Sequence, residues 1–515
     1  MHLQTAPGID GKARLAVMDL GSNSFRLVVF TAAGGWWKRT DEIYEPVRIG
    51  EGLAATGRLG EQPIERALAT LEVFAHFCEA AALTGEDVDA VATSAIRDAE
   101  NAAEFLQRAH ARTGLPIRVL SREAEARYGY LAAVNSTTLR DGSVLDLGGG
   151  SMQLVRVSER GARELGSWPL GAVRMTERFL PGGDPVGRRA LKELRTEVTR
   201  QLADAPWLQA TGGRLVGIGG TVRNLAAATQ RAAGLPSNGV QGMVIERDAL
   251  DELVQRLAEL PAAERSSIAG IKPARADLIL AGAVVVQGVL EAGGFEGLET
   301  TEAGLREGVF FERHLHPRDP PLFEDVRRAS VLNLAARYDV DARHSDHVAK
   351  LALGMFDELA RLGLHGGDAL ERELLWAACM LHDIGMSVDY DDHHKHSRYL
   401  ILSAGLPGFT PAEVALIAQA ARYHRKGMPD PGPLAALFDE PQRARLDRCA
   451  VLLRLAEDLE RSRDQTVRGT SIALHGGEVE LRLLAAREPA VPRWAASRER
   501  ELFARAFDRA LSVAA

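Results

Sequence analysis

The chain has 515 residues, of which 46% are hydrophobic and 26% are charged, and its formal net charge at pH 7 is −8. This composition is typical of a soluble globular protein with roughly two to four domains. The acidic balance excludes a general nucleic-acid coat, although a local basic groove for an anionic substrate stays open. No apolar run approaches the about 18 residues that a membrane-spanning helix needs.

The beginning of the chain lacks the apolar core of a signal peptide, so we expect residues 1–14 to be a frayed tail. The few cysteines, Cys78, Cys379 and Cys449, follow no spaced ligand pattern. They predict reduced thiols in the core of a cytoplasmic protein.

Strands and helices alternate from the start of the chain. Residues 15–31 alternate as a strand, and the turn at Gly34-Gly35 with residues 36–49 predicts a hairpin partner. Apolar spacings of three and four then predict amphipathic helices, and short apolar runs predict buried strands. In chain order these segments are a helix at 62–84, a strand at 88–97 running into a turn, a helix at 101–114, a strand in "PIRVLS" and a helix at 122–135.

The same pattern restarts in the middle of the chain. It predicts a strand at 143–148, hairpin partners within 152–168, helices near 174–204 and a strand-turn-helix at 214–230. After the proline-rich "HPRDPPLFEDV" helical periodicity prevails, most of the histidines occur, and residues 471–485 suggest a hairpin. Alternating strands and helices predict α/β sheets with helices on their faces. We therefore expect α/β lobes at 1–134 and 135–316 and a helical domain at 317–515.

One phrase occurs twice, as "LAVMDLGSNSFRLVVF" at 15–30 and as "GSVLDLGGGSMQLV" at 142–155. Each copy has an apolar run, an Asp-Leu-Gly, a small polar turn and another apolar run. Small residues leave backbone N–H groups bare as an anion nest, and Asp19 or Asp146 beside it can hold Mg²⁺ directly or through water. Two such turns, one in each lobe, predict a clamp on opposite sides of one phosphate chain. The alternative is that each copy is only a tight turn without a ligand. Two copies in the same context make this alternative less convincing than one copy would.

A third glycine-rich turn, "GIGGT" at 217–221, opens a predicted helix. Its amides and the helix N-terminus, at Gly220 and Thr221, are suited to another anion or to a nucleotide sugar. Taken alone, this turn is weak evidence.

Six segments stand in this order along the chain: "DLGSNSFRL", "TSAIRDAEN", "SREAEARYGYLA", "DLGGGSMQLV", "GIGGTVRNLA" and "GLREGVFFE". Together they resemble the exopolyphosphatase/guanosine pentaphosphate phosphatase (Ppx/GppA) family, within the sugar-kinase/actin-like ATPase superfamily. The resemblance spans nearly the whole chain and implies two ribonuclease-H-like lobes, an active site in the cleft between them, and a helical third domain. It also implies Mg²⁺-dependent (or Mn²⁺-dependent) removal of the terminal phosphate from polyphosphate or guanosine pentaphosphate (pppGpp), and a homodimer.

The resemblance also assigns roles to single residues. It places the catalytic Glu at Glu125, which would accept a proton from the attacking water, whereas without it Glu125 reads as a solvated helix-face charge. Asp146 matches a second essential carboxylate that holds metal or positions water, and Asp19 occupies the equivalent place in the first turn. Arg97 matches an arginine whose bidentate fork suits the terminal phosphate. The expected phosphate nest comprises Ser22, Asn23, Ser24, Gly148, Gly149 and Ser151.

One position departs from the family pattern. Where relatives commonly carry an acidic residue, as in "GGGSTE", this chain has "GGGSMQ" with Gln153. Gln153 can orient water or coordinate a metal through its carbonyl oxygen, but it supplies no negative charge and no base. We expect weaker metal binding or an altered substrate preference.

The histidine-rich region resembles the HD phosphohydrolase superfamily, whose His and Asp residues bind divalent metals. His344, His382 and Asp383 fit the first three ligand positions, and Glu457 in "LAEDLERS" stands where an Asp is usual. This is a candidate second metal site, and a vestigial scaffold is the alternative. A third interpretation is that several basic side chains line a path for a polyanion, namely His396, His424, Arg425 and Lys426.

Four functions compete at this point. The leading hypothesis is an exopolyphosphatase, with a pppGpp 5′-phosphohydrolase as the nearest enzymatic alternative. A polyphosphate- or nucleotide-sensing module with weakened catalysis is the rival from another class. A kinase of the same superfamily would need a recognisable sugar or acid pocket, which the sequence does not offer.

Overall fold

The computed structural model describes residues 12–182, 185–210, 213–236 and 238–514. These residues fall into two compact units, Met1–Val326 (unit 1) and Arg327–Ala515 (unit 2). The lobe and domain boundaries proposed from the sequence stay predictions.

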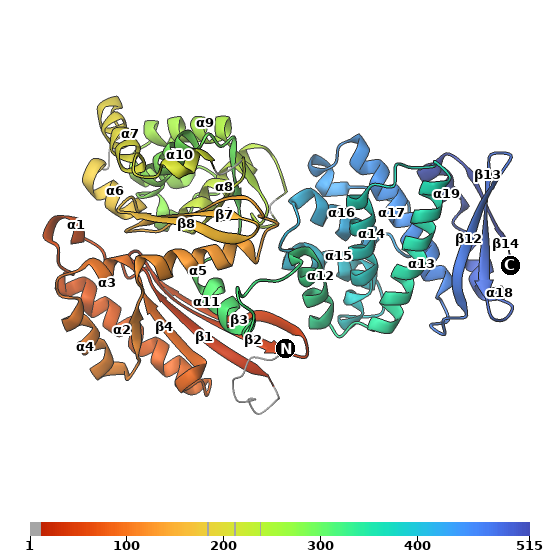
Figure 1. Ribbon diagram of the computed structural model, residues 1–515, viewed down its shortest axis with the longest axis horizontal. Helices are drawn as coiled ribbons and strands as arrows, with labels where there is room; N and C mark the ends of the chain where they lie inside the picture. Colours follow the sequence, from red (N-terminus) through yellow and green to blue (C-terminus); the bar gives the residue numbers. More distant parts are fainter. Residues whose placement is uncertain (1–11, 183–184, 211–212, 237, 515) are drawn as a thin grey trace. The chain divides into compact units, whose positions relative to one another are not determined.

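The first sheet of unit 1 has the strand order β3-β2-β1-β4-β5 (Figure 1). Its central strand β1 pairs antiparallel with β2 and parallel with β4. Apolar side chains of β1 and β2 are buried on both faces, which is typical of strands covered by other layers on both sides. The strands are β1 (Ala13–Leu20), β2 (Phe25–Ala33), β3 (Trp36–Glu45), β4 (Val88–Ala92) and β5 (Ile117–Val119).

The second sheet repeats this arrangement and adds an edge strand, in the order β10-β11-β9-β6-β7-β8. Its central strand β6 pairs antiparallel with β7 and parallel with β9, as β1 does with β2 and β4. The doubled phrase is therefore a structural repeat, because its two copies form β1-turn-β2 and β6-turn-β7. The strands are β6 (Gly142–Leu147), β7 (Met152–Ser158), β8 (Gly161–Trp168), β9 (Leu215–Ile218), β10 (Val244–Glu246) and β11 (Gly297–Thr300).

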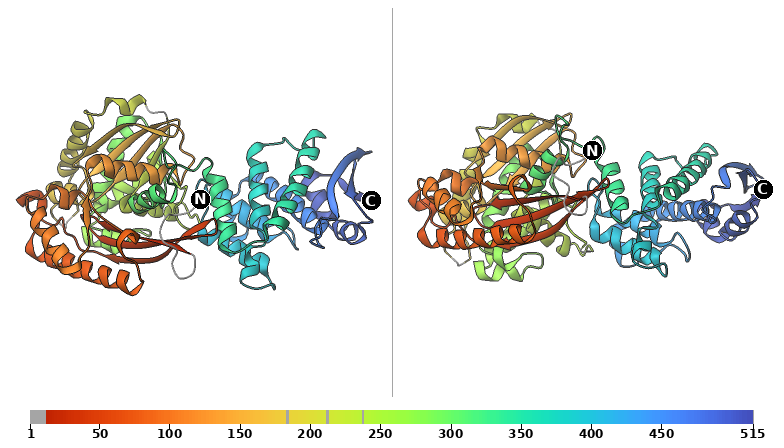
Figure 2. Two further views of the ribbon diagram at one scale, coloured as in Figure 1. Left: turned by 60° about the horizontal axis from the view of Figure 1, so that its bottom comes forward. Right: turned by 90° about the horizontal axis from the view of Figure 1, so that it is seen from below.

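Helices cover the outer face of each sheet and fill the space between the sheets. One apolar core packs α2 and α4 against the first sheet. Another packs α7, α8, α9 and α10 against the second sheet. A third core holds α5 and α11 between the two sheets, where all views place them (Figures 1 and 2). The helices of unit 1 are α1 (Leu53–Thr56), α2 (Glu61–Ala80), α3 (Ser94–Asp98), α4 (Ala102–Thr113), α5 (Arg122–Val134), α6 (Ala172–Phe179), α7 (Arg188–Leu202), α8 (Gly220–Ala232), α9 (Arg247–Glu259), α10 (Ile279–Gly293) and α11 (Leu305–His314).

The single strand predicted for residues 15–31 is wrong, because the chain reverses there between β1 and β2. Gly21 N donates a hydrogen bond to Ser24 O (3.2 Å) and closes the turn. Two adjacent strands that are both buried resemble one long apolar run, so the pattern hid the reversal. The predicted tail is only partly testable: residues 1–11 lie outside the described residues, whereas Ala13 and Arg14 belong to β1. The hairpin at Gly34-Gly35 is confirmed, with both glycines at positive φ.

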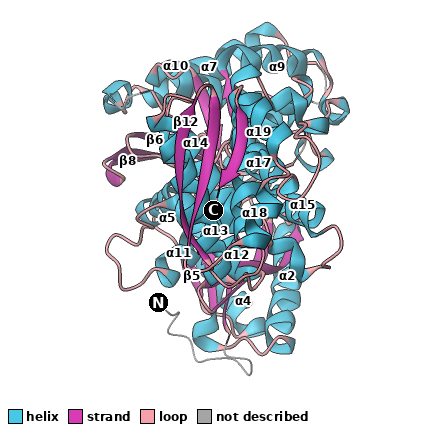
Figure 3. Ribbon diagram, turned by 90° about the vertical axis from the view of Figure 1, so that its right-hand side faces the viewer, coloured by secondary structure: helices cyan, strands magenta, loops and turns pink. Residues whose placement is uncertain are grey.

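Unit 2 is mainly helical, and its described residues share one apolar core. The hairpin predicted near 471–485 is confirmed as β12 and β13, to which β14 adds a parallel strand (Figure 3). Its elements are α12 (Val326–Arg337), α13 (Ala342–Arg361), α14 (Ala369–Leu381), α15 (His393–Ala404), α16 (Pro411–Arg422), α17 (Glu440–Leu459), β12 (Val467–His475), β13 (Glu478–Ala485), α18 (Ala490–Ala496), α19 (Arg500–Phe507) and β14 (Ala510–Ala514).

Two further expectations concern the whole chain. Within the described ranges, no helix combines the length and the apolar character that crossing a bilayer requires. Cys78, Cys379 and Cys449 are buried and form no disulfide, as expected for core thiols.

Candidate active site

Both copies of the repeated turn face one cavity of about 120 Å³ in unit 1. The first copy follows β1 and the second follows β6, so equivalent ends of the two sheets meet there. Five of the nest residues predicted from the sequence line this cavity, together with three carboxylates and the third glycine-rich turn. The predicted residues in its wall are Asp19, Ser22, Asn23, Ser24, Glu125, Asp146, Gly148, Gly149 and Gly220.

The two repeated turns touch one another at glycines that leave no room for a side chain. A Cβ on Gly150 would lie 2.6 Å from Ser94 Oγ and 2.8 Å from Ser22 Oγ. The hydroxyls of Ser22 and Ser94 are themselves hydrogen-bonded at 3.1 Å. A Cβ on Gly149 would meet Ser22 Cβ at 3.2 Å. The small residues of the phrase thus permit a close approach of the lobes beside the cavity.

The third glycine-rich turn brings the N-terminus of α8 to the cavity. Gly219 has φ +106°, a conformation that favours glycine, and a Cβ there would lie 2.6 Å from Leu147 O. The cavity wall includes Gly219 and Gly220, so the free N–H groups at the start of α8 are available to an anion. Thr221, predicted as a phosphate contact, is buried beside Gly282 of α10 and is not part of the cavity wall, so its role stays a prediction.

Three carboxylates in the cavity wall have raised pKa values. Burial, reinforced by the negative charges of Glu125 and Asp19, raises the pKa of Asp146 to about 7. Burial also raises the pKa of Glu125, against the opposing effect of Arg97. For Asp19, burial raises the pKa and outweighs the nearby arginines Arg306 and Arg26. The carboxylates therefore repel one another at neutral pH in the absence of a cation.

Four arginines in the same wall were not singled out from the sequence. Burial, together with the charges of Arg306 and Arg26, lowers the pKa of Arg223 to about 10. Within the described chain, Arg306 Nε and Nη1 are buried without a hydrogen-bond acceptor. The lining arginines are Arg26, Arg223, Arg275 and Arg306. Three of them stand inside the segments "DLGSNSFRL", "GIGGTVRNLA" and "GLREGVFFE", which is the signal that was available.

Glu125, near the start of α5, is held by partners on both of its oxygens. Arg97 Nη1 donates to Oε2 at 2.7 Å, and Ser151 Oγ donates to Oε1 at 3.4 Å. Gln153 Nε2 donates to Ser151 Oγ at 2.8 Å and to Ser167 Oγ at 3.3 Å. Arg97, Ser151 and Gln153 thus form a hydrogen-bonded network around Glu125.

The side chains of Arg97 and Gln153 are hydrogen-bonded to other protein groups, which the sequence did not predict. Arg97 is paired with Glu125, so its proposed role as a ligand of the terminal phosphate stays a prediction. Gln153 lies directly opposite Asp146 in the β6–β7 pair, but its amide nitrogen is engaged with the two serines. Its expected part in metal binding also stays a prediction.

The donor set of the cavity fits Mg²⁺. Asp19, Glu125 and Asp146 offer hard carboxylate oxygens, and the cation would relieve their mutual repulsion. Among the described residues, groups of ligand atoms that all lie within 4.8 Å of one another occur in unit 2 alone. The oxygens of these three carboxylates are therefore spaced more widely than that. This spacing suits an ion that keeps several of its waters, as Mg²⁺ does.

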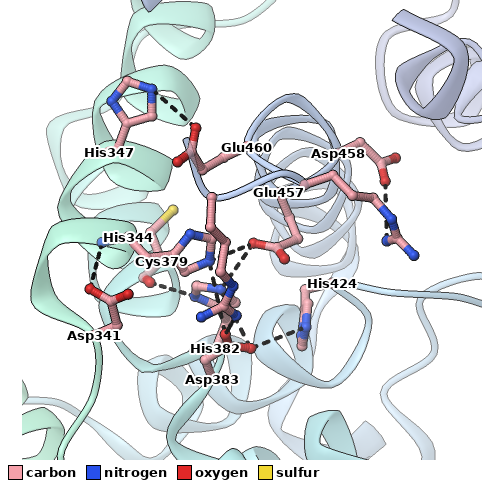
Figure 4. A network of polar contacts seen from close by, with 12 residues as sticks. Asp341, His344, His347, Cys379, His382, Asp383, His424, Glu457, Asp458 and Glu460 are labelled. Atoms are coloured by element: carbon pink, nitrogen blue, oxygen red, sulfur yellow. Dashed lines mark hydrogen bonds and ion pairs between the residues drawn. The ribbon is translucent and has the colours of Figure 1, made fainter. Parts of the chain in front are cut away.

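Unit 2 brings together all four residues of the candidate second metal site (Figure 4). His344 Nε2 lies 3.0 Å from Glu457 Oε2, and His382 Nε2 lies 3.3 Å from the same oxygen. Asp383 Oδ2 is 3.9 Å from His344 Nε2. His424 joins this cluster and is buried, so it does not line the basic path that was the alternative interpretation.

Solved structures with a similar fold exist for part of the chain. A Ppx/GppA family member from Aquifex aeolicus is 32% identical with a TM-score of 0.50, over 58% of this chain and 96% of that chain. An exopolyphosphatase-like protein is 26% identical with a TM-score of 0.53, over 58% and 96% of the two chains. An exopolyphosphatase from Cytophaga hutchinsonii is 22% identical with a TM-score of 0.54 and the same coverage, which is a likeness of fold.

Family comparison covers both units. Residues 28–316 match the Ppx/GppA phosphatase family, and residues 326–489 match Ppx/GppA phosphatase, domain III. The first match alone spans more than half of the chain and contains the second repeated turn and α5, whereas the first repeated turn lies before it. The HD-like character of unit 2 stays a prediction. By its two α/β sheets, its helical second unit and these matches, the chain belongs to the Ppx/GppA phosphatase family.

Proposed function

We propose that this protein is an exopolyphosphatase that removes the terminal phosphate of inorganic polyphosphate in the cavity of unit 1, with Mg²⁺ or Mn²⁺. The observation that supports this most is the presence of three carboxylates and four arginines in one cavity between two glycine-rich turns. Each set of like charges is destabilised by burial and by mutual repulsion. A divalent cation bound together with a polyanion would neutralise both sets.

The reaction would begin with Glu125 taking a proton from a water molecule as the water oxygen attacks the terminal phosphorus. The bridging P–O bond breaks, and its electron pair stays on the shortened polyphosphate. Arg97 and Ser151 hold the two oxygens of Glu125, so its carboxylate is already oriented. Asp19 and Asp146 would hold a magnesium ion, which would supply positive charge to offset that of the phosphate.

The phosphate chain would be held by backbone amides and by arginines. The turns after β1 and β6 and the N-terminus of α8 provide N–H groups around the cavity. Arg306, whose buried Nε and Nη1 have no hydrogen-bond acceptor among the described residues, is the arginine best placed to gain one from the substrate. Phosphoryl transfer to water needs little beyond such positioning and charge neutralisation.

Polyphosphate is favoured over pppGpp by the composition of the cavity wall. No aromatic side chain stands among the described residues that line it, so the cavity offers no stacking surface for guanine. The terminal phosphoanhydride is the same in both substrates, and pppGpp therefore remains the second candidate.

The decisive experiment compares phosphate release from polyphosphate and from pppGpp at equal concentrations of terminal phosphates, with Mg²⁺. We expect faster release from polyphosphate, and loss of release from both substrates in Glu125→Gln. Faster release from pppGpp would reverse the substrate assignment. Tight binding of polyphosphate without release would instead favour the sensing module.

Two further expectations accompany this proposal. The family resemblance predicts a homodimer, which sedimentation of the purified chain checks. The three unpaired cysteines favour a cytoplasmic location.

A further inference from the structure

Glu42, on the edge strand β3, faces two of the four arginines that line the cavity of unit 1. Arg26 Nη1 donates a hydrogen bond to Glu42 Oε1 at 3.1 Å, and Arg306 Nη1 lies 3.7 Å from the same oxygen. The other oxygen, Oε2, is 3.2 Å from Nη1 of the exposed Arg39. Glu42 is not among the described residues that line the cavity, so it acts on the cavity only through its neighbours.

The two guanidinium groups that meet at Glu42 come from distant parts of the chain. Arg26 is on β2 and Arg306 is on α11, and Trp37 of β3 packs against Phe310 of α11 with their ring centres 5.2 Å apart. Both guanidinium groups are positively charged and face one oxygen, so they repel one another at short range. The Arg306 side chain is 6% exposed and that of Arg26 is 23% exposed. Arg26 is therefore the one that would turn outward if the negative charge between them were removed.

Tyr44 holds Arg26 from a second direction. It lies directly opposite Arg26 in the β2–β3 pair, and the guanidinium carbon of Arg26 is 4.6 Å from the centre of the Tyr44 ring. Glu42 and Tyr44 are two residues apart on one strand, so their side chains point to the same face of the sheet. An aromatic ring beneath the guanidinium and a carboxylate at its edge together restrict Arg26 to one orientation.

We propose that Glu42 is a positioning residue that keeps the guanidinium groups of Arg26 and Arg306 side by side, so that the pair binds one phosphate group of the substrate together. Each guanidinium presents a planar fork of donors that matches phosphate oxygens. Nε and Nη1 of Arg306 have no hydrogen-bond acceptor among the described residues, and a phosphate would supply one. The inference rests on the function proposed for this cavity, and it concerns a residue outside all six segments that resemble the family.

The KM of a Glu42→Gln variant separates positioning from simple charge. If Glu42 acted only through its charge, its removal would attract a polyanion more strongly and lower KM. If Glu42 holds Arg26 and Arg306 together, KM for polyphosphate should instead rise by about 3- to 10-fold, with kcat within about twofold of the wild type, because binding common to ground state and transition state is lost. Circular dichroism checks that the variant is folded. An unchanged or lower KM in the folded variant would overturn the proposal.

Two neighbours on β3 provide matched variants. Asp41 is exposed and, as the adjacent residue, points to the opposite face of the strand, so Asp41→Asn should keep the KM of the wild type. Tyr44→Leu removes the ring beneath Arg26 and should raise KM, whereas Tyr44→Phe keeps the ring and should stay close to the wild type. A rise in Asp41→Asn as large as that in Glu42→Gln would assign the effect to the charge of the strand and contradict the proposal.

A double-mutant cycle identifies the partner of Glu42. Arg26→Gln should raise KM, and Glu42→Gln added to it should raise KM no further, because the two residues act as a unit. Effects that multiply independently would overturn the proposal. If the wild type released no phosphate from polyphosphate, the proposed function would fail separately. The same variants would then be compared by the dissociation constant of polyphosphate in titration calorimetry, where equal affinities of Glu42→Gln and the wild type would overturn the positioning role.

Discussion

Two features of the site act in opposite directions on the pKa of Glu125. Burial favours its neutral form, whereas the hydrogen bond from Arg97 favours the carboxylate that a base requires. The proposed role therefore depends on partners that come from α3 and from the turn before β7. Its neighbour Glu123 is on the same helix but exposed. A comparison of the two glutamates therefore distinguishes the proposed catalytic role of Glu125 from the effect of removing a negative charge from this helix.

Replacing the base should remove most of the activity. In Glu125→Gln we expect kcat for phosphate release to fall by about 10²- to 10⁴-fold, as is usual when a general base is lost. Glu123→Gln should stay close to wild type. Steady-state phosphate release from polyphosphate measures both, and equal effects in the two variants would argue against Glu125 as the base.

The departure at Gln153 predicts an effect on metal binding. Gln153→Glu places a carboxylate opposite Asp146 across the β6–β7 pair. We expect a several-fold lower Mg²⁺ concentration at half-maximal rate and a higher turnover, because an added oxygen ligand strengthens binding of a hard cation. A magnesium titration of the rate measures this. Unchanged magnesium dependence would show that Gln153 acts only through Ser151.

Asp146 should make the metal-free protein less stable as the pH rises. Its pKa is about 7 in the folded chain against 3.8 for the unperturbed group, so the unfolded chain ionises first. Folded-state stability is then lost as the pH rises from about 4 to about 7. With a chelator, Asp146→Asn should be more stable than wild type by on the order of 2 kcal/mol at pH 8 and by little at pH 4. Urea unfolding at both pH values measures the difference, which saturating Mg²⁺ should reduce.

At the scale of elements, the two turns are effective because they lie against each other. β1 and β6 end at the same place in unit 1, and the glycines after β6 allow Ser22 and Ser94 to approach. The N-terminus of α8 completes the wall, at Gly219 and Gly220. The site is thus an arrangement of strand ends and a helix start, which local sequence already encodes.

A single methyl group at this contact should disturb the site. In Gly150→Ala the new Cβ would lie within 3 Å of the hydroxyls of Ser94 and Ser22. We expect a loss of about 1–3 kcal/mol in the free energy of unfolding and a marked fall in kcat/KM. Gly187→Ala is the control, because a Cβ there meets nothing within 4 Å. A wild-type rate in Gly150→Ala would contradict the close contact.

At the scale of the molecule, the chain has separate apolar cores in its two units. Leu225 is fully buried in α8 of unit 1, and Leu453 is fully buried in α17 of unit 2. We expect calorimetry to resolve two unfolding transitions, since each unit has its own core. Leu225→Ala should lower the free energy of unfolding of unit 1, and Leu453→Ala that of unit 2, each by about 2–5 kcal/mol. A single transition shifted equally by both variants would refute this independence.

What the sequence determined by itself was local and repetitive. The doubled Asp-Leu-Gly phrase predicted two related α/β lobes with two facing turns, because strand periodicity and small turn residues depend on near neighbours. Those patterns also fixed the helices at 62–84, 101–114 and 122–135 to within a few residues of α2, α4 and α5. They failed at 15–31, where two buried strands share the apolar pattern of one.

Only the tertiary structure decided which charged groups meet. Arg306 reaches the cavity from a helix that follows Asp19 by nearly three hundred residues, and Arg97 pairs with Glu125 rather than facing an open site. In unit 2, His393 and His424 join Asp383 from two further elements. Such convergence depends on how helices and sheets pack over long sequence separations, and no spacing along the chain records it.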